Sequence, residues 1–183
     1  MRMKNETGKS VSLRTGKGGQ DSITLAPAVA ITPDGEIPVM RIKAAYPLKQ
    51  NEGEHRAYFK TDSFFMSKDA DAIAAFLRGQ NGRAMFNIGE DGRDSLDLSM
   101  NEIEVSHDHY MPAMRIKVLV PSEHPDGKPR FSISVFNKGT AIAMAVIIED
   151  WLERVEENNE IDQLELRIRE LEEELSETVP LEG

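Results

Sequence analysis

Two six-residue segments of the chain place an arginine and a lysine two positions apart in the same surroundings. Pro38-Val39-Met40-Arg41-Ile42-Lys43 returns as Pro112-Ala113-Met114-Arg115-Ile116-Lys117, at an offset of 74 positions (112 − 38). Residues i and i+2 of a β-strand share one face, so each arginine would lie beside its lysine. Guanidinium and ammonium groups arranged in this way bind anions, and phosphate in particular. These segments therefore suggest binding of a phosphate backbone.

Other chemistries lack a complete set of residues. Gly8-Lys9-Ser10 resembles the end of a phosphate-binding loop, but Met3 stands where that motif needs its first glycine. His107-Asp108-His109 has no third metal ligand at a suitable spacing and is expected to be a surface loop. The chain has no cysteine, and no serine lies in a nucleophile-elbow pattern. We therefore expect a protein that is not an enzyme, without catalytic residues, bound metal or cofactor.

The cationic segments belong to a longer internal repeat. Near the same offset Gly8-Lys9 matches Gly82-Arg83, Asp21-Ser22-Ile23 matches Asp94-Ser95-Leu96, and Arg56 matches Arg130. At 75 positions Ile73, Phe76 and Leu77 match Ile148, Trp151 and Leu152. Self-similarity at a fixed period indicates a repeated structural unit. We expect one copy in residues 7–80, a second in residues 81–155, and a separate tail in residues 156–183.

Each copy has the pattern of four strands and a helix. In the first, alternating apolar residues predict strands over 9–15, 22–26, 37–46 and 56–66, and an apolar stripe predicts a helix over about 67–79. The second repeats that order and ends in a helix from about Thr140, whereas residues 1–6 are polar and expected to fray. Because units this small bury little surface alone, the predicted fold is α+β: two tandem β-β-β-β-α repeats packed as an intramolecular pseudo-dimer, plus a C-terminal acidic helix.

Strand alternation predicts a binding face. If the apolar positions of the third and fourth strands cover the helix, the opposite face carries seven cations and one tyrosine, with no acid among them. These residues are Arg41, Lys43, Arg56, Tyr58, Lys60, Arg115, Lys117 and Arg130. Such a face suits single-stranded DNA or RNA, since phosphates pair with cations and each stacked base contributes about 1–3 kcal/mol. The alternative is a solvated sheet face whose charges only keep the protein soluble.

The predicted architecture resembles that of known single-strand-binding families. Tandem β-β-β-β-α units paired as a pseudo-dimer are similar to PUR repeats, Whirly proteins and the positive-cofactor transcriptional coactivator. The resemblance is one of topology, covers residues 7–155 and includes no diagnostic motif. It implies that single-stranded DNA or RNA lies on sheet faces while the helices hold the two halves together.

The tail carries most of the net charge of −10. Residues 1–155 hold 20 basic and 21 acidic side chains, whereas the residues from Glu156 onward hold 2 and 11. The apolar residues of the tail are spaced three and four apart, as at the a and d positions of a coiled coil: Ile161, Leu164, Ile168, Leu171 and Leu175. We expect a helix that either associates with another copy of the chain or docks on its own body. Its glutamates would recruit a protein partner or compete with nucleic acid, or would only form a solvated helix surface: Glu170, Glu172, Glu173, Glu174, Glu177 and Glu182.

A second function stays open at this stage. The chain could be a protein-interaction module, such as an inhibitor or adaptor of the kind that phages encode, using the acidic tail or a sheet edge against a basic partner. No apolar run approaches the roughly 18 residues of a membrane span, and the N-terminus lacks the apolar core of a signal peptide. We therefore expect a cytoplasmic protein that has no membrane partner.

Overall fold

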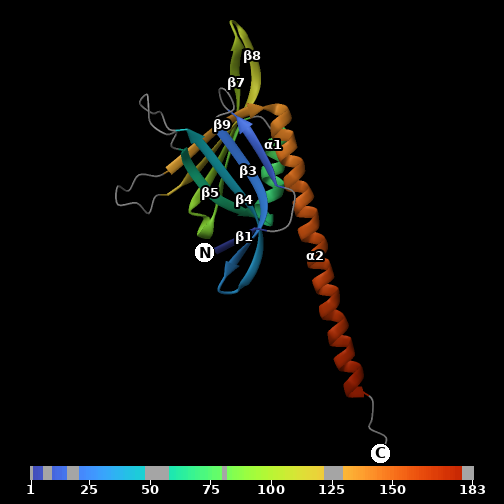
Figure 1. The fold of residues 1–183 in the computed structure, drawn as a ribbon. Coiled ribbons are helices and arrows are strands. Elements are labelled where there is room, and N and C mark those ends of the chain that lie inside the picture. Colours follow the sequence, from blue (N-terminus) through green and yellow to red (C-terminus); the bar gives the residue numbers. More distant parts are fainter. Residues whose placement is uncertain are drawn as a thin grey trace, which may run out of the picture.

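The computed structural model describes residues 2–5, 10–15, 21–47, 58–79, 82–121 and 130–178. Within these ranges the fold is α+β, with two antiparallel sheets and two helices (Figure 1). The second helix is the last described element and extends far beyond the sheets (Figure 1). The predicted fold class and the predicted C-terminal helix are confirmed.

The first sheet is built from the N-terminal half. It comprises β1 (Arg2–Asn5), β2 (Val11–Thr15), β3 (Asp21–Thr32), β4 (Gly35–Pro47) and β5 (Tyr58–Met66), and α1 (Ser67–Leu77) follows β5 directly. The strand order is β1-β3-β4-β5, and β2 also pairs with β3. The expectation that residues 1–6 fray is wrong for residues 2–5, because β3 is long enough to pair with β2 through residues 21–25 and with β1 through residues 28–31.

The second sheet has the order β6-β7-β8-β9. Its strands are β6 (Arg83–Ile88), β7 (Asp94–Ser106), β8 (His109–Val120) and β9 (Arg130–Asn137), with a short 3-10 helix, η2 (Glu90–Gly92), between β6 and β7. β9 runs directly into α2 (Lys138–Thr178), which has 41 residues. The ends of β7 and β8 project from the body as a hairpin (Figure 1). His107 and Asp108 form its turn, in keeping with the surface loop expected there.

The larger of two apolar clusters among the described residues joins both sheets and both helices. Inward residues of β3 and β4, inward residues of β7 and β8, and the buried sides of α1 and α2 belong to one apolar cluster. Trp151 of α2 is 1% exposed, and its ring meets that of Phe65 edge to face at a centroid distance of 6.3 Å. Aromatic pairs favour this geometry over face-to-face contact. Both helices also bury alanines, which leave room for their close approach.

Polar contacts tie the second sheet to β5. The N–H of Gly89 donates to the carbonyl of Phe64 at 2.7 Å, and the buried hydroxyl of Ser63 donates to the carboxylate of Asp94. Gly89 has φ +78°, and a Cβ there would collide with the Asp94 carboxylate, so the turn requires glycine. Burial raises the pKa of Asp94, while the hydrogen bond from Ser63 acts in the opposite direction.

Strand register relates the two halves position by position. Arg41 pairs with Phe64, and Arg115 pairs with Val135. If β4 and β8 are aligned at their arginines, 74 positions apart, β5 and β9 are therefore offset by 71 positions (135 − 64). The two helices also begin 71 positions apart (138 − 67). The predicted offsets of 74 for the fourth strand and 75 for the helix are wrong, because the second half is three residues shorter between its third and fourth strands.

α2 is one continuous helix that crosses the boundary expected at residue 156. Val155 is buried, whereas every residue from 156 to 175 is exposed. The alternative in which the tail docks on its own body is therefore wrong for these residues. Within the described ranges, no helix combines the length and the apolar character needed to span a membrane.

Replacing Trp151 with alanine should lower the free energy of unfolding by about 3–5 kcal/mol, because the cavity would open where both halves meet. Val146 lies on the same helix but is 47% exposed. The matched variant Val146→Ala should change stability by less than about 1 kcal/mol. Urea unfolding followed by circular dichroism measures both values, and similar losses for the two variants would contradict a core centred on Trp151.

Candidate nucleic-acid interface

The outer face of each sheet is the one turned away from the shared core. On β4, Met40 and Ile42 are buried in the core, and alternation turns Arg41 and Lys43 to the outer face. On β8 the corresponding buried residues are Met114, Ile116 and Val118. The structure therefore places Arg115 and Lys117 together on the outer face of the second sheet.

Asp62 of β5 engages Arg41 on the outer face of the first sheet. Its carboxylate accepts hydrogen bonds from Nε of Arg41 at 2.8 Å and from Nη2 of the same side chain. The pair leaves the Arg41 side chain 17% exposed, and the hydrogen bonding to Asp62 raises the arginine pKa. Lys43 lies opposite Asp62 in the register and is exposed. The expectation of an outer face without acids is wrong, because the fourth strand brings Asp62 beside both cations.

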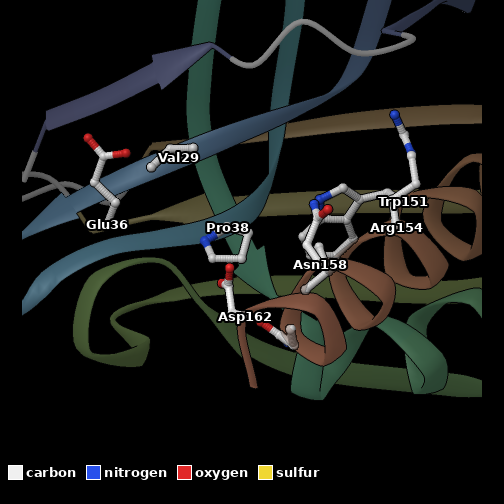
Figure 2. A pocket seen from close by; sticks show the side chains of 9 residues that line it. Val29, Glu36, Pro38, Trp151, Arg154, Asn158 and Asp162 are labelled. Carbon is white, nitrogen blue, oxygen red and sulfur yellow. The ribbon is translucent and has the colours of Figure 1, made fainter. Parts of the chain in front are cut away.

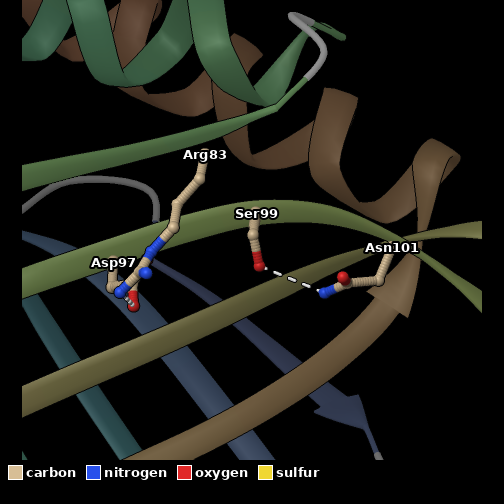
Figure 3. Close-up of polar contacts among 4 residues, drawn as sticks. All are labelled: Arg83, Asp97, Ser99 and Asn101. Atoms are coloured by element: carbon tan, nitrogen blue, oxygen red, sulfur yellow. Dashed lines mark hydrogen bonds and ion pairs between the residues drawn. The ribbon is translucent and has the colours of Figure 1, made fainter.

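A carboxylate also lies on the outer face of the second sheet. Arg83 of β6 donates from Nε and Nη2 to the two oxygens of Asp97, both at 2.8 Å (Figure 3). Asp97 is 14% exposed and lies opposite Lys117 in the register. The hydrogen bonds from Arg83 lower the pKa of Asp97 against the opposing effect of burial, and the charges of Arg83, Arg115 and Lys117 add to the lowering.

Polar side chains continue this face toward the projecting hairpin. Ser99 lies opposite Arg115, and its hydroxyl accepts a hydrogen bond from the side-chain amide of Asn101 at 3.1 Å (Figure 3). Among the described side chains of this outer face, three cations therefore accompany one carboxylate, for a formal charge of +2. The cations are Arg83, Arg115 and Lys117. Such a surface attracts a polyanion while keeping its side chains in fixed positions.

Two of the predicted residues lie on β5 beside the Arg41 and Lys43 positions. The register pairs Lys60 with Ala45 and Tyr58 with Pro47, which places both strand positions on the outer side of the first sheet. Arg56 lies outside the described residues.

Arg130 does not share a face with Arg115. The register pairs Arg130 with Val120, on the side of the sheet that holds Ile116 and Val118, so the predicted placement is wrong. The three-residue difference between the halves is an odd number, and a shift by an odd number moves a strand position to the opposite face. The same shift turns the positions of Phe131 and Ile133 toward the outer side, where they pair with Leu119 and Lys117.

Sequence reasoning missed two cations on the outer faces. Arg14 of β2 is exposed and pairs with Ser22, and Arg83 occupies the edge strand β6 of the second sheet. The signal was present in the alternation of Val11 and Leu13, which turns the intervening positions and Arg14 outward. The prediction considered only the third and fourth strands of each half.

A separate hollow of about 450 Å³ lies where α2 leaves the first sheet. Its lining includes Trp151, Arg154 and Asn158 of α2 and Glu36 and Pro38 of β4, and in Figure 2 Glu36 lies at the end away from Trp151. Within the described part of the chain, Nε1 of Trp151 has no hydrogen-bond partner, and no three histidine or carboxylate side chains are grouped as they would be in a metal site. Because its lining mixes one arginine with two carboxylates, the hollow does not extend the cationic surface.

Comparison with known proteins adds little to this geometry. No family model and no curated protein matches the chain. Among solved structures, the chain is similar to WHY1 from Arabidopsis thaliana, a Whirly protein, with a TM-score of 0.48 and 10% identity over 88% of this chain and 96% of that chain. This similarity is too low to establish a shared fold.

The lowered pKa of Asp97 predicts how stability depends on pH. The pair with Arg83 should stabilise the fold above the ordinary carboxyl pKa of 3.8, and this contribution should disappear as the pH falls through the lowered pKa of the folded state. Asp97→Asn should cost about 0.5–1 kcal/mol at neutral pH and very little near pH 2. Thermal melts across that range measure the difference. The stability cost of Arg83→Gln should depend on pH in the same way as that of Asp97→Asn. A cost of Asp97→Asn that does not change with pH would contradict a stabilising pair between Arg83 and Asp97.

Proposed function

We propose that the protein binds single-stranded nucleic acid, without catalysis, across the outer faces of its two sheets. The observation that carries this proposal is the formal charge of +2 among the described side chains of the second outer face. Phosphates would pair with Lys117, Arg115 and Arg83, releasing counterions from the polyanion. The ion pair to Asp97 would offset part of the charge of Arg83 and so limit the strength of that contact.

Apolar positions beside these cations support a single strand over a duplex. Met85 is exposed on the same face, and the register brings the position of Phe131 opposite Leu119. Unpaired bases can pack on apolar and aromatic surfaces of this kind, whereas the bases of a duplex are stacked on one another. On the first sheet, the position of Tyr58 lies on the same side as Lys43.

We infer that the two halves are copies of one β-β-β-β-α unit packed as an intramolecular pseudo-dimer, with residues 7–80 and 81–155 as the copies. Support comes from the matching order of strands β2–β5 and β6–β9. The fourth strands and the helices of the two halves are also offset by the same 71 positions. When the two helices are aligned at that offset, four buried positions of α1 correspond to four buried positions of α2. They are Ala70 with Ala141, Ile73 with Met144, Ala74 with Ala145, and Leu77 with Ile148. A duplication supplies two related cationic faces to one nucleic-acid strand.

Removing one lysine from each outer face should weaken binding. Lys43→Gln combined with Lys117→Gln should raise the Kd for labelled oligothymidine about 30-fold at low salt, if each lost contact is worth about 1 kcal/mol. The slope of log K against log salt should become shallower by about 1.4, at about 0.7 per phosphate contact. The control is Lys68→Gln with Lys138→Gln, which removes two exposed lysines from the helices instead. Fluorescence anisotropy measures both, and equal affinities for the two double variants would refute the assigned faces.

Removing the carboxylate of the second face should tighten binding. Asp97→Asn raises the local charge by one unit, so the Kd for the same oligothymidine should fall about five-fold at low salt, from about 1 kcal/mol of relieved repulsion. The matched variant Asp71→Asn makes the same change at an exposed position of α1 and should leave the Kd unchanged. Equal tightening by both variants would mean that only the net charge of the protein matters, and weaker binding by Asp97→Asn would contradict the proposal.

A further inference from the structure

The part of α2 beyond the body is an isolated helix with an apolar seam. Residues 156–178 extend it by about 35 Å at about 1.5 Å per residue, away from both sheets (Figure 1). Five large apolar side chains on this extension are 42–65% exposed. They are Ile161, Leu164, Ile168, Leu171 and Leu175. All five belong to a stretch, residues 156–175, in which every residue is exposed to solvent.

These five side chains form one stripe along the helix. At about 100° per residue they fall within an arc of about 80°, whereas Leu166 lies on the opposite side. Their spacing alternates between three and four residues, which keeps the stripe facing a partner helix as two helices supercoil. Most of the acidic side chains lie off this stripe, and Asp162, Glu170 and Glu173 lie on the opposite side of the helix.

We propose that this seam is the dimerisation surface of the protein and that its occupant is the same seam of a second copy, in a parallel two-stranded coiled coil. Ile161 and Ile168 stand at a positions, and Leu164 and Leu171 at d positions. β-branched residues at a with leucine at d favour two strands in parallel coiled coils. In this register Arg167 lies beside the partner's Glu172, a pair of opposite charge, whereas Glu160 lies beside the partner's Glu165, a pair of like charge that adds to the repulsion between the tails.

The body prepares the helix for association. A short, glutamate-rich helix is marginal alone because its first turn is costly to form, but here the buried turns of α2 that precede residue 156 serve as the nucleus. Arg167 now pairs with Glu170 in an exposed i, i+3 contact at 2.9 Å. Because exposed ion pairs are weak, Arg167 can exchange this partner for one on a second copy at little cost. Association therefore requires little reordering of the chain.

The charge of the tail gives this dimer a characteristic salt dependence. Residues 156–183 hold 11 acidic and 2 basic side chains, so two tails repel each other through solvent. Added salt screens that repulsion and should strengthen the dimer. A basic protein partner on the same seam would show the opposite trend, because salt would screen its attraction to the acidic helix. The proposal is independent of nucleic-acid binding, and its consequence there is that a dimer would present two bodies to one strand.

Sedimentation equilibrium of the full chain tests the stoichiometry. The wild type should be a dimer at micromolar concentrations, and its Kd should fall as salt is raised. Leu164→Gln with Leu171→Gln should raise that Kd at least about 100-fold, while Leu166→Gln should leave it unchanged, although Leu166 is also exposed. Circular dichroism of the body and tail checks that the variants remain folded. A monomeric wild type, a trimer, or equal effects of the seam and control variants would overturn the proposal.

The absence of cysteine from the chain allows a direct test of orientation. In a parallel dimer the two copies of residue 164 face each other, so Leu164→Cys should form an interchain disulfide readily on mild oxidation. Leu166→Cys, on the outer side of the helix, should remain largely reduced. Equal crosslinking of the two variants, or none at residue 164, would overturn the parallel arrangement.

Discussion

The fold depends on one apolar core that both halves of the chain must complete. Inward residues of β3, β4, β7 and β8 and the buried sides of two helices belong to the same cluster, with Trp151 among its largest members. Each half alone would leave its sheet and helix facing water, at a cost proportional to the exposed apolar area. Because this core takes one face of each sheet, binding is left to the opposite face, and strand alternation decides which residues it presents. On the first sheet part of that face, around Val39 and Phe64, is itself buried in a second apolar cluster.

The outer faces carry less positive charge than their cations alone would give, because each face also holds a carboxylate. Arg41 is held by Asp62 in the first sheet, and Arg83 is held by Asp97 in the second. Bidentate pairs of this type fix the arginine planes, which favours recognition by geometry over unspecific attraction. The acidic residues of the tail from Glu156 to Glu177 lie on a helix that leaves the body, so most of the net negative charge of the chain is separated from the cationic surface.

The sequence predicted the features that depend on local pattern. The order of strands β2–β9 and of the two helices, the α+β class and the outward direction of Arg41, Lys43, Arg115 and Lys117 all follow from period and alternation. Features that depend on pairing between distant strands were not predictable. The contact of Asp62 with Arg41 needs the register of β4 with β5, and the position of Arg130 depends on a three-residue difference between two connections. The pairing of β1 was missed because its polar residues carry no strand pattern, and β3 alone supplies its partner. The docked alternative for the tail could not be rejected from its heptads, since both arrangements use the same apolar residues.

The most direct measurement of the central claim is photocrosslinking of the full chain to oligothymidine, followed by mass spectrometry of the crosslinked peptides. Nucleic acid on the outer faces predicts crosslinks concentrated in peptides from β4 and β8, with more of them in β8, whose Arg115 and Lys117 share their face with Arg83 of β6. Those crosslinks should be lost in the presence of high salt or unlabelled competitor. Crosslinks confined to α2 or to the β7–β8 hairpin tip, or none at low salt, would contradict the account.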